Sequence, residues 1–387
     1  MATTSITERQ YDVRRYREIT AEVEVMAFKT WKIPLILIVS VLIISIVIVS
    51  LGMVLYVDYL SNSSSDYRDF TISKEPVTEE TSFNYFDRYQ DDANVQIAVC
   101  NNRLYYYFGA IKGVKLKHRD KIGYIEEGKI VYVCSVDRYL GSANGYIYYI
   151  KNDSLYAFDS LAEKSSKITQ VTYYSYDFDF EGGLMFIPDK KKDIRLYIKD
   201  GTILKKEKVS GPFQTFQLGE NTYWLYGAYS SKDLYCNGEV ISDKIGGGGN
   251  NERVLFPATD GLILSNPGGE NTLYYIYPDG RIELMFPEID GVGPYTALTV
   301  YGNYVFLSFK RVSGLDESKK KYEFYDEDTL SGTYRIDIRD KSYVKISDTY
   351  YEGLYVFDDT GVYCTTNKGL VQKLDFDGNV VATILTP

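Results

Sequence analysis

The sequence predicts an all-β fold, a seven-bladed β-propeller, preceded by one transmembrane helix. From residue 83 onward, runs of Tyr, Phe, Val and Ile alternate with polar residues. Gly, Asn or Asp interrupts them about every 8–12 residues, which is typical of short strands joined by tight turns. A unit of about 40 residues recurs within this pattern, as in propeller blades. Upstream, residues 33–57 contain no charged side chain.

The repeat is easiest to follow by the aromatic strand in each copy. These strands begin near residues 103, 145, 183, 222, 261, 303 and 361. Each copy adds one strand before this one and two after it, the last two joined by an Asp-Gly-like turn. Four strands in a period of about 40 residues indicate one blade, so we expect seven blades. Six is the alternative if the copy that starts at Arg103 is only a partial blade.

The apolar run IPLILIVSVLIISIVIVSLGMVLYV, 33–57, is long enough to cross a bilayer. A hydrocarbon core of about 30 Å needs roughly 20 apolar residues in a helix. It is longer than the apolar core of a cleaved signal peptide, and no Ala-x-Ala site follows it. Lys29 and Lys32 precede it and Asp58 follows it. The positive-inside rule then predicts a cytoplasmic N-terminus and an extracytoplasmic C-terminal part.

Four segments are therefore expected in a single-pass protein of the cell membrane. Residues 1–32 would be a cytoplasmic segment with a short amphipathic helix, and residues 33–57 the transmembrane helix. Residues 58–82 are rich in Ser, Thr and charged side chains, which is typical of a flexible stalk. Residues 83–387 would form the extracytoplasmic propeller.

Composition restricts the possible partners and chemistry. The formal net charge of −10 argues against nucleic acid or another polyanion as the bulk partner. The four cysteines, Cys100, Cys134, Cys236 and Cys364, lie in strand-like runs and are expected to be buried free thiols, with Cys100–Cys134 the one disulfide considered. His118 is the only histidine, which disfavours histidine-based catalysis and metal binding. We expect no metal, no cofactor and a monomer.

Several repeat copies resemble a known family. The segments TLYYIYPDGRIEL (272–284) and TYRIDIRDKSYVKI (333–346) are similar to the repeats of tyrosine-rich β-propellers on bacterial cell surfaces. Those proteins have no known function and are often described by their likeness to propellers of the low-density-lipoprotein-receptor type. The resemblance implies a propeller at a cell surface. Its motifs are packing motifs, so it implies no catalytic residue.

The candidate binding residues lie on one predicted face of the propeller. Connections between the second and third strands of every blade share this face, whereas the Asp/Asn-Gly turns lie on the opposite face. Turn geometry accounts for the Asp/Asn-Gly pairs, but it does not require the lysines. Two irregular loops, 246–251 and 310–332, are expected on the same face. The candidate residues are Lys190, Lys191, Lys192, Lys232, Arg311, Lys319, Lys320 and Lys321.

These features favour a non-enzymatic binding or scaffold module for a protein or an anionic cell-surface ligand. Loops on a rigid scaffold are common binding sites, although surface lysines are often only solvated. Two alternatives remain open. One is a cell-surface glycan-active enzyme with carboxylates in the central channel. The other is a transmembrane sensor that signals through residues 1–32.

Overall fold

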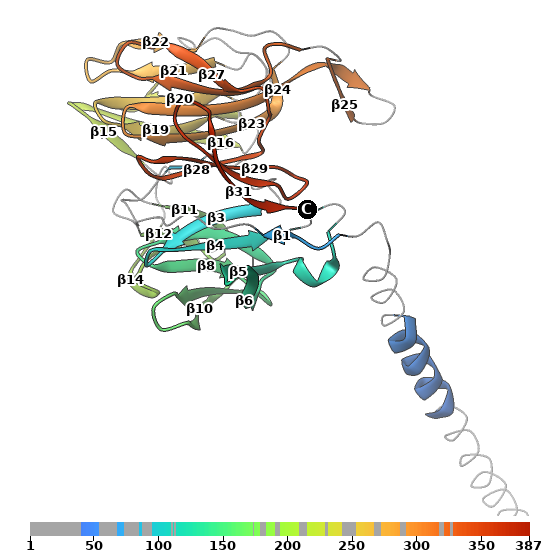
Figure 1. The fold of residues 1–387 in the computed structure, drawn as a ribbon. Helices are drawn as coiled ribbons and strands as arrows, with labels where there is room; N and C mark the ends of the chain where they lie inside the picture. The colour runs from blue at the N-terminus through green and yellow to red at the C-terminus, as the bar shows by residue number, and fades with distance from the viewer. Residues whose placement is uncertain are drawn as a thin grey trace, which may run out of the picture. The chain divides into compact units, whose positions relative to one another are not determined.

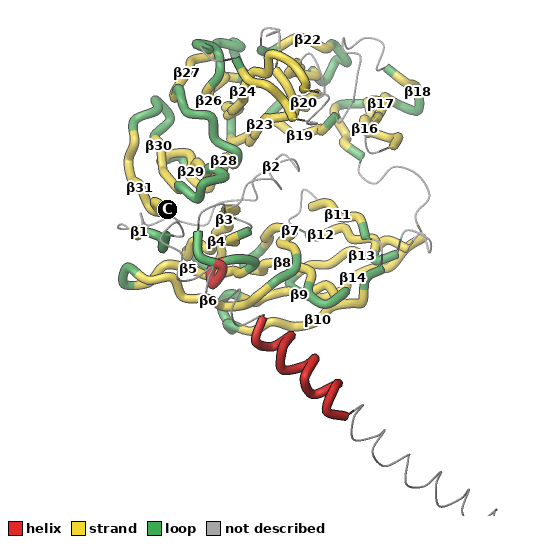
Figure 2. Tube along the Cα trace, turned by 90° about the vertical axis from the view of Figure 1, so that its right-hand side faces the viewer, coloured by secondary structure: helices red, strands yellow, loops and turns green. Residues whose placement is uncertain are grey.

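The structure, a computed structural model, falls into two compact units, Met1–Tyr67 and Arg68–Pro387. It describes residues 40–53, 68–72, 85–86, 95–109, 111, 114–172, 174–178, 183–189, 194–208, 215–228, 231–241, 253–266, 272–286, 292–316, 321–325 and 328–387. In the first unit, residues 40–53 form an α-helix (Figure 2). No helix in the described part of the chain combines the length and the hydropathy that a membrane crossing requires. The predicted cytoplasmic segment, 1–32, and both ends of the predicted span, 33–39 and 54–57, lie outside the described residues.

The second unit is a β-propeller of seven antiparallel sheets (Figures 1 and 2). Each sheet holds at least four strands, and the four core strands of each blade pair in chain order. The predicted seven blades are confirmed. The six-bladed alternative is wrong, because the copy that contains Arg103 is a complete four-stranded sheet.

Blades 1 to 5 are plain four-stranded sheets. Blade 1 contains β3 (Val95–Cys100), β4 (Arg103–Phe108), β5 (Lys121–Glu126) and β6 (Lys129–Ser135). Blade 2 contains β7 (Arg138–Ala143), β8 (Tyr146–Ile150), β9 (Ser154–Asp159) and β10 (Lys164–Gln170). Blade 3 contains β11 (Ser175–Phe178), β12 (Leu184–Ile187), β13 (Ile194–Lys199) and β14 (Thr202–Lys208). Blade 4 contains β15 (Phe216–Leu218), β16 (Asn221–Ala228), β17 (Ser231–Cys236) and β18 (Glu239–Val240). Blade 5 contains β19 (Val254–Ala258), β20 (Gly261–Asn266), β21 (Thr272–Ile276) and β22 (Ile282–Leu284).

Blades 6 and 7 carry additional strands. Blade 6 contains β23 (Val292–Tyr301), β24 (Tyr304–Asp316), β26 (Gly332–Asp337) and β27 (Tyr343–Ser347). Two further strands join it: β2 (Tyr85–Phe86) pairs with β23, and β25 (Lys321–Phe324) pairs with β24. Blade 7 contains β28 (Gly353–Asp358), β29 (Gly361–Thr365), β30 (Val371–Leu374) and β31 (Val380–Thr386), and β1 (Thr71–Ile72) pairs with β31. A short 3-10 helix, η2 (Leu116–His118), lies between β4 and β5.

Local sequence explains the hairpins that define the repeat. The predicted aromatic strands are the second strands of the blades, and they start at residues 103, 146, 184, 221, 261, 304 and 361. Turn residues adopt left-handed backbone, such as Asn237 (φ 50°) and Gly238 (φ 95°) between β17 and β18. Gly378 (φ 95°) is also required by space, because a Cβ there would collide with the backbone carbonyl of Ile346 in blade 6.

Aromatic side chains fill the junctions between blades. Six apolar clusters of buried residues each draw on two neighbouring blades, and one of them joins blade 7 to blade 1. The largest fully buried side chains include seven tyrosines: Tyr105, Tyr106, Tyr148, Tyr149, Tyr223, Tyr351 and Tyr363. Rings of this size bury a large apolar area, so these tyrosines serve packing. All four cysteines are free thiols, but only Cys100 and Cys364 are buried as predicted, whereas Cys134 and Cys236 are partly exposed.

The β domain begins earlier than the sequence pattern predicts. Residues 68–72 fall within the predicted stalk, 58–82, yet they belong to the second compact unit. There, Thr71 pairs with Thr386 and Ile72 pairs with Leu385, so that β1 adds to the outer edge of blade 7. A two-residue strand is too short to show an alternating pattern, so it is not recognisable in a polar segment. Its pairing partner also lies more than 300 residues away in the sequence.

Candidate functional site

The connections between second and third strands meet at one end of the blades, and we call this end the lysine face. Of the candidate residues, Lys190, Lys191 and Lys192 follow Asp189 and lie outside the described residues, as do Lys319 and Lys320. Lys232 lies in β17, where its backbone pairs with Gly227, and Lys321 begins β25 opposite Asp316. Arg311 lies in β24. The loop 246–251 also lies outside the described residues.

The insertion 310–332 is not the irregular loop that its composition suggested. β24 continues past blade 6 as far as Asp316, and its extension pairs with β25 from Val312↔Phe324 to Asp316↔Lys321. The two strands form a β-hairpin that extends beyond the sheet (Figure 1), and we call it the arm. Charged residues at the tip concealed the alternation on which a strand prediction depends.

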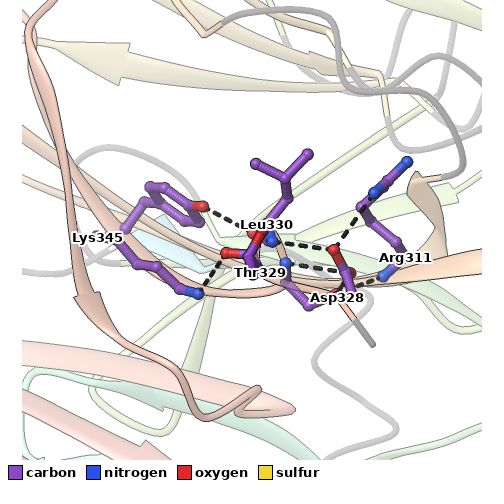
Figure 3. Close-up of polar contacts among 7 residues, drawn as sticks. Arg311, Asp328, Thr329, Leu330 and Lys345 are labelled. Carbon is purple, nitrogen blue, oxygen red and sulfur yellow. Dashed lines mark hydrogen bonds and ion pairs between the residues drawn. The ribbon is translucent and has the colours of Figure 1, made fainter. Parts of the chain in front are cut away.

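A polar network fixes the base of the arm (Figure 3). Arg311 Nη1 lies 3.3 Å from Asp328 Oδ1, and the Arg311 backbone N–H donates to Ser331 Oγ at 2.9 Å. The carboxylate of Asp328 accepts the backbone N–H groups of Leu330 (2.9 Å) and Ser331 (3.1 Å), and it also accepts the Ser331 hydroxyl. The Arg311 guanidinium lies 4.5 Å from the ring centroid of Tyr325. One arginine therefore connects both strands of the arm to the turn that enters β26.

Neighbouring strands hold the same turn from the other side. The Tyr334 hydroxyl donates to the Leu330 carbonyl at 2.7 Å, and Lys345 Nζ donates to the Thr329 carbonyl at 2.8 Å (Figure 3). Burial alone would raise the pKa of Asp328, but hydrogen bonds from Ser331 and Leu330 and the pair with Arg311 outweigh it and lower that pKa. Since Arg311 is engaged within the protein, we expect it to position the arm.

Replacing Asp328 by asparagine is expected to loosen the arm and to lower the free energy of unfolding by about 2–3 kcal/mol. The side chains of Asp328 and Arg311 are only 7% and 17% exposed, so the arginine charge would lose its partner in a poorly hydrated place. Urea unfolding and limited proteolysis of the arm measure the effect. Asp348→Asn is the matched control, since Asp348 pairs with Lys345 at 2.6 Å but is 96% exposed. Equal effects of the two substitutions would contradict the assignment.

A carboxyl group that sequence patterns did not single out lies at the lysine face of blade 7. Glu352 precedes β28, and its Oε2 accepts the backbone N–H of Asn367 at 3.0 Å. Burial raises the pKa of Glu352, and the hydrogen bond from Asn367, together with nearby Lys310 and Lys368, offsets this only in part. Lys310 Nζ in turn lies 3.9 Å from the ring centroid of Phe324 in the arm. A single Glu in a strand-like run carries no local signal that could have revealed this arrangement.

No three His, Cys, Asp or Glu side chains among the described residues are grouped so that they could hold a metal ion. At the lysine face, the described residues include Lys310, the arm and the half-buried carboxyl group of Glu352.

Similarity to known proteins is distant. No protein-family model and no curated protein matches the sequence. Among solved structures, the chain is similar to the extracellular domain of a proposed hybrid two-component system from B. thetaiotaomicron (14% identity, TM-score 0.46), covering 79% of this chain and 44% of that one. It is also similar to the β-propeller domain of the Trilobed protease from Pyrococcus furiosus (13% identity, TM-score 0.45), covering 78% and 98%. A third is PorZ, a surface component of the type-IX secretion system of Porphyromonas gingivalis (13% identity, TM-score 0.31), covering 81% and 53%.

The chain thus spans less than half the length of the two-component-system domain.

Proposed function

We propose that this protein is a membrane-anchored, extracytoplasmic binding or scaffold module. The observation that carries the anchor is the exposure of the helix at residues 40–53. All ten of its large apolar side chains, from Val41 to Met53, are 55–67% exposed. Water disfavours so much exposed apolar surface, whereas the hydrocarbon of a bilayer would cover it. Lys29 and Lys32 before this segment and Asp58 after it support an extracytoplasmic propeller.

The lysine face is the proposed binding surface. Its arm projects from a rigid sheet and is braced by Arg311 and Asp328, so that a partner could bind without first ordering a flexible loop. The lysines at 190–192 and 319–321, predicted from the sequence to lie at this end, are the proposed contacts. A protein or cell-surface polymer with negative charge is the proposed ligand, because several lysines together attract polyanions over a distance of about 10 Å.

Charge reversal tests the proposed surface. The purified full chain, in detergent micelles, is titrated against heparin as the probe polyanion, with neutral dextran as the comparison. We expect reversal of Lys190–Lys192 together with Lys319–Lys321 to Glu to weaken heparin binding at least tenfold, and more strongly at low salt. Reversal of Lys129, Lys164 and Lys199, beside turns of the opposite face, is the control and should change the Kd less than twofold. Unchanged binding by the first variant would refute a role for the lysine face in anion binding.

A further inference from the structure

The residues 68–72 form a strap across the junction between the first and last blades. Blade 1 is built from β3–β6 and blade 7 from β28–β31, so the four core strands of each blade are contiguous in the chain. Neither blade combines core strands from the N-terminal and the C-terminal parts of the domain. On one side, the strap pairs with β31 through Thr71 and Ile72. On the other, Arg68 bridges to Val114, and the Phe70 ring lies 5.3 Å from that of Phe108 in β4. The strap of five residues therefore contacts both blade 7 and blade 1.

A chain of hydrogen bonds fastens the strap to blade 1. Asp69 Oδ1 lies 2.5 Å from His118 Nε2, and Tyr132 Oη, from β6, contacts His118 Nδ1. Lys117 Nζ donates to Asp69 Oδ2 at 2.8 Å, and Lys115 Nζ lies 3.7 Å from the same oxygen. His118 is only 5% exposed. The one histidine of the protein thus lies between the strap and the sheet.

These contacts are all satisfied by neutral histidine. With the proton on Nε2, the imidazole donates to Asp69 and accepts from the Tyr132 hydroxyl at Nδ1. Burial lowers the pKa of His118; Asp69 opposes this in part, and Lys117 and Lys121 lower that pKa further. Burial would raise the pKa of Asp69, but hydrogen bonds from Lys117 and His118 outweigh it and lower the pKa to about 2. Burial and the charge of Asp69 raise the pKa of Tyr132, which therefore keeps its proton.

We propose that the strap is an acid-releasable clasp that holds blades 1 and 7 together. The reason is a difference in proton binding between two states. When the strap is released, His118 becomes solvated and takes up a proton at its ordinary pKa of about 6.5. When the strap is bound, the buried imidazole takes up that proton only at lower pH. Acidification below about pH 6.5 therefore favours the released state, since the state that binds more protons gains population as pH falls.

Hydrogen exchange of the full chain in detergent micelles measures the release. After correction for intrinsic exchange rates, we expect amides of the strap and of the paired end of β31 to exchange several-fold faster at pH 5.5 than at pH 7.5. At pH 5.5, one unit below the ordinary histidine pKa, protonation of released His118 can raise the population of the released state by at most about tenfold. Amides of β20 and β21, remote from this junction, should show no such change. Equal strap exchange at both pH values would overturn the proposal.

Two variants separate the clasp from general acid sensitivity. His118→Gln retains an N–H donor for Asp69 but cannot titrate, so its strap exchange should not depend on pH. Glu163→Gln is the matched control: Glu163 pairs with Arg103 at 3.0 Å across the junction of blades 1 and 2, and this variant should respond to pH as the natural protein does. A full pH response in His118→Gln would rule out His118 as the sensor.

A direct titration serves if His118→Gln fails to fold. Because the sequence contains one histidine, ¹³C-histidine labelling yields one imidazole signal, provided that any affinity tag lacks histidine. We expect that signal to titrate below pH 6.5. Titration at or above pH 6.5 would overturn the proposal, because the pKa of His118 in the bound state would then not be lower than in the released state.

Discussion

Deletion of residues 33–57 is expected to move the protein almost completely from the membrane fraction to the soluble fraction. The helix at residues 40–53 carries ten large apolar side chains, and each of them is more than half exposed. At about 0.8 kcal/mol for each buried CH₂ group, their insertion into a bilayer would hold the protein there with no measurable release. Sedimentation of alkaline-washed membranes, followed by immunoblotting, measures the distribution.

Two controls sharpen this experiment. Deletion of residues 1–28 keeps Lys29, Lys32 and the apolar run, and this variant should stay in the membrane pellet. Ile44→Lys combined with Ile48→Lys retains the length but introduces two charges, each costing about 3 kcal/mol at a helix centre, and should reduce the membrane-bound fraction. Retention of the 33–57 deletion in the alkaline-washed pellet would show that the β domain binds membranes by another route.

Phe306→Ala is expected to lower the free energy of unfolding by about 3–5 kcal/mol. Phe306 lies in β24, is fully buried, and packs in the cluster that joins blade 6 to blade 7. Its ring centroid is 5.0 Å from that of Phe376, across the two blades. Since domains have net stabilities of only about 5–15 kcal/mol, such a cavity would remove a large part of the total.

Urea unfolding followed by circular dichroism measures this change. Phe306→Leu should have an intermediate effect, because it leaves a smaller cavity. Leu204→Ala is the control: Leu204 is 66% exposed and should change the free energy of unfolding by less than about 0.5 kcal/mol. A loss of less than 1 kcal/mol for Phe306→Ala would contradict the packing role assigned to this junction.

The strap and the arm illustrate how the propeller uses chain outside the repeat. The strap reaches the outer edge of blade 7 and the connection before β5, and so stabilises a junction that no shared sheet closes among the described strands. The arm extends β24 beyond blade 6 and is fixed by the carboxylate of Asp328. Edge strands and projecting hairpins remain accessible for such additions because their backbone groups are not all paired within the blade.

Local sequence determined the repeat and its period. Alternating apolar residues and Asn, Asp or Gly turns act within one hairpin, so they appear in a contiguous stretch of sequence. For this reason the number of blades could be predicted. The start of each second strand could be predicted to within one residue, as β8 at Tyr146 and β24 at Tyr304 show. The free thiols and the packing role of the buried tyrosines follow from the same strand pattern.

Tertiary structure alone decided the roles of individual polar residues. His118 had no recognisable motif, because its partners Asp69 and Tyr132 are 49 residues before it and 14 residues after it. Arg311 looked like one more cation of the lysine face, yet the fold pairs it with Asp328. Glu352 acquires its raised pKa from burial, a property of the packed structure. Backbone hairpins depend on neighbours in sequence, whereas ion pairs and burial depend on residues that only folding brings together.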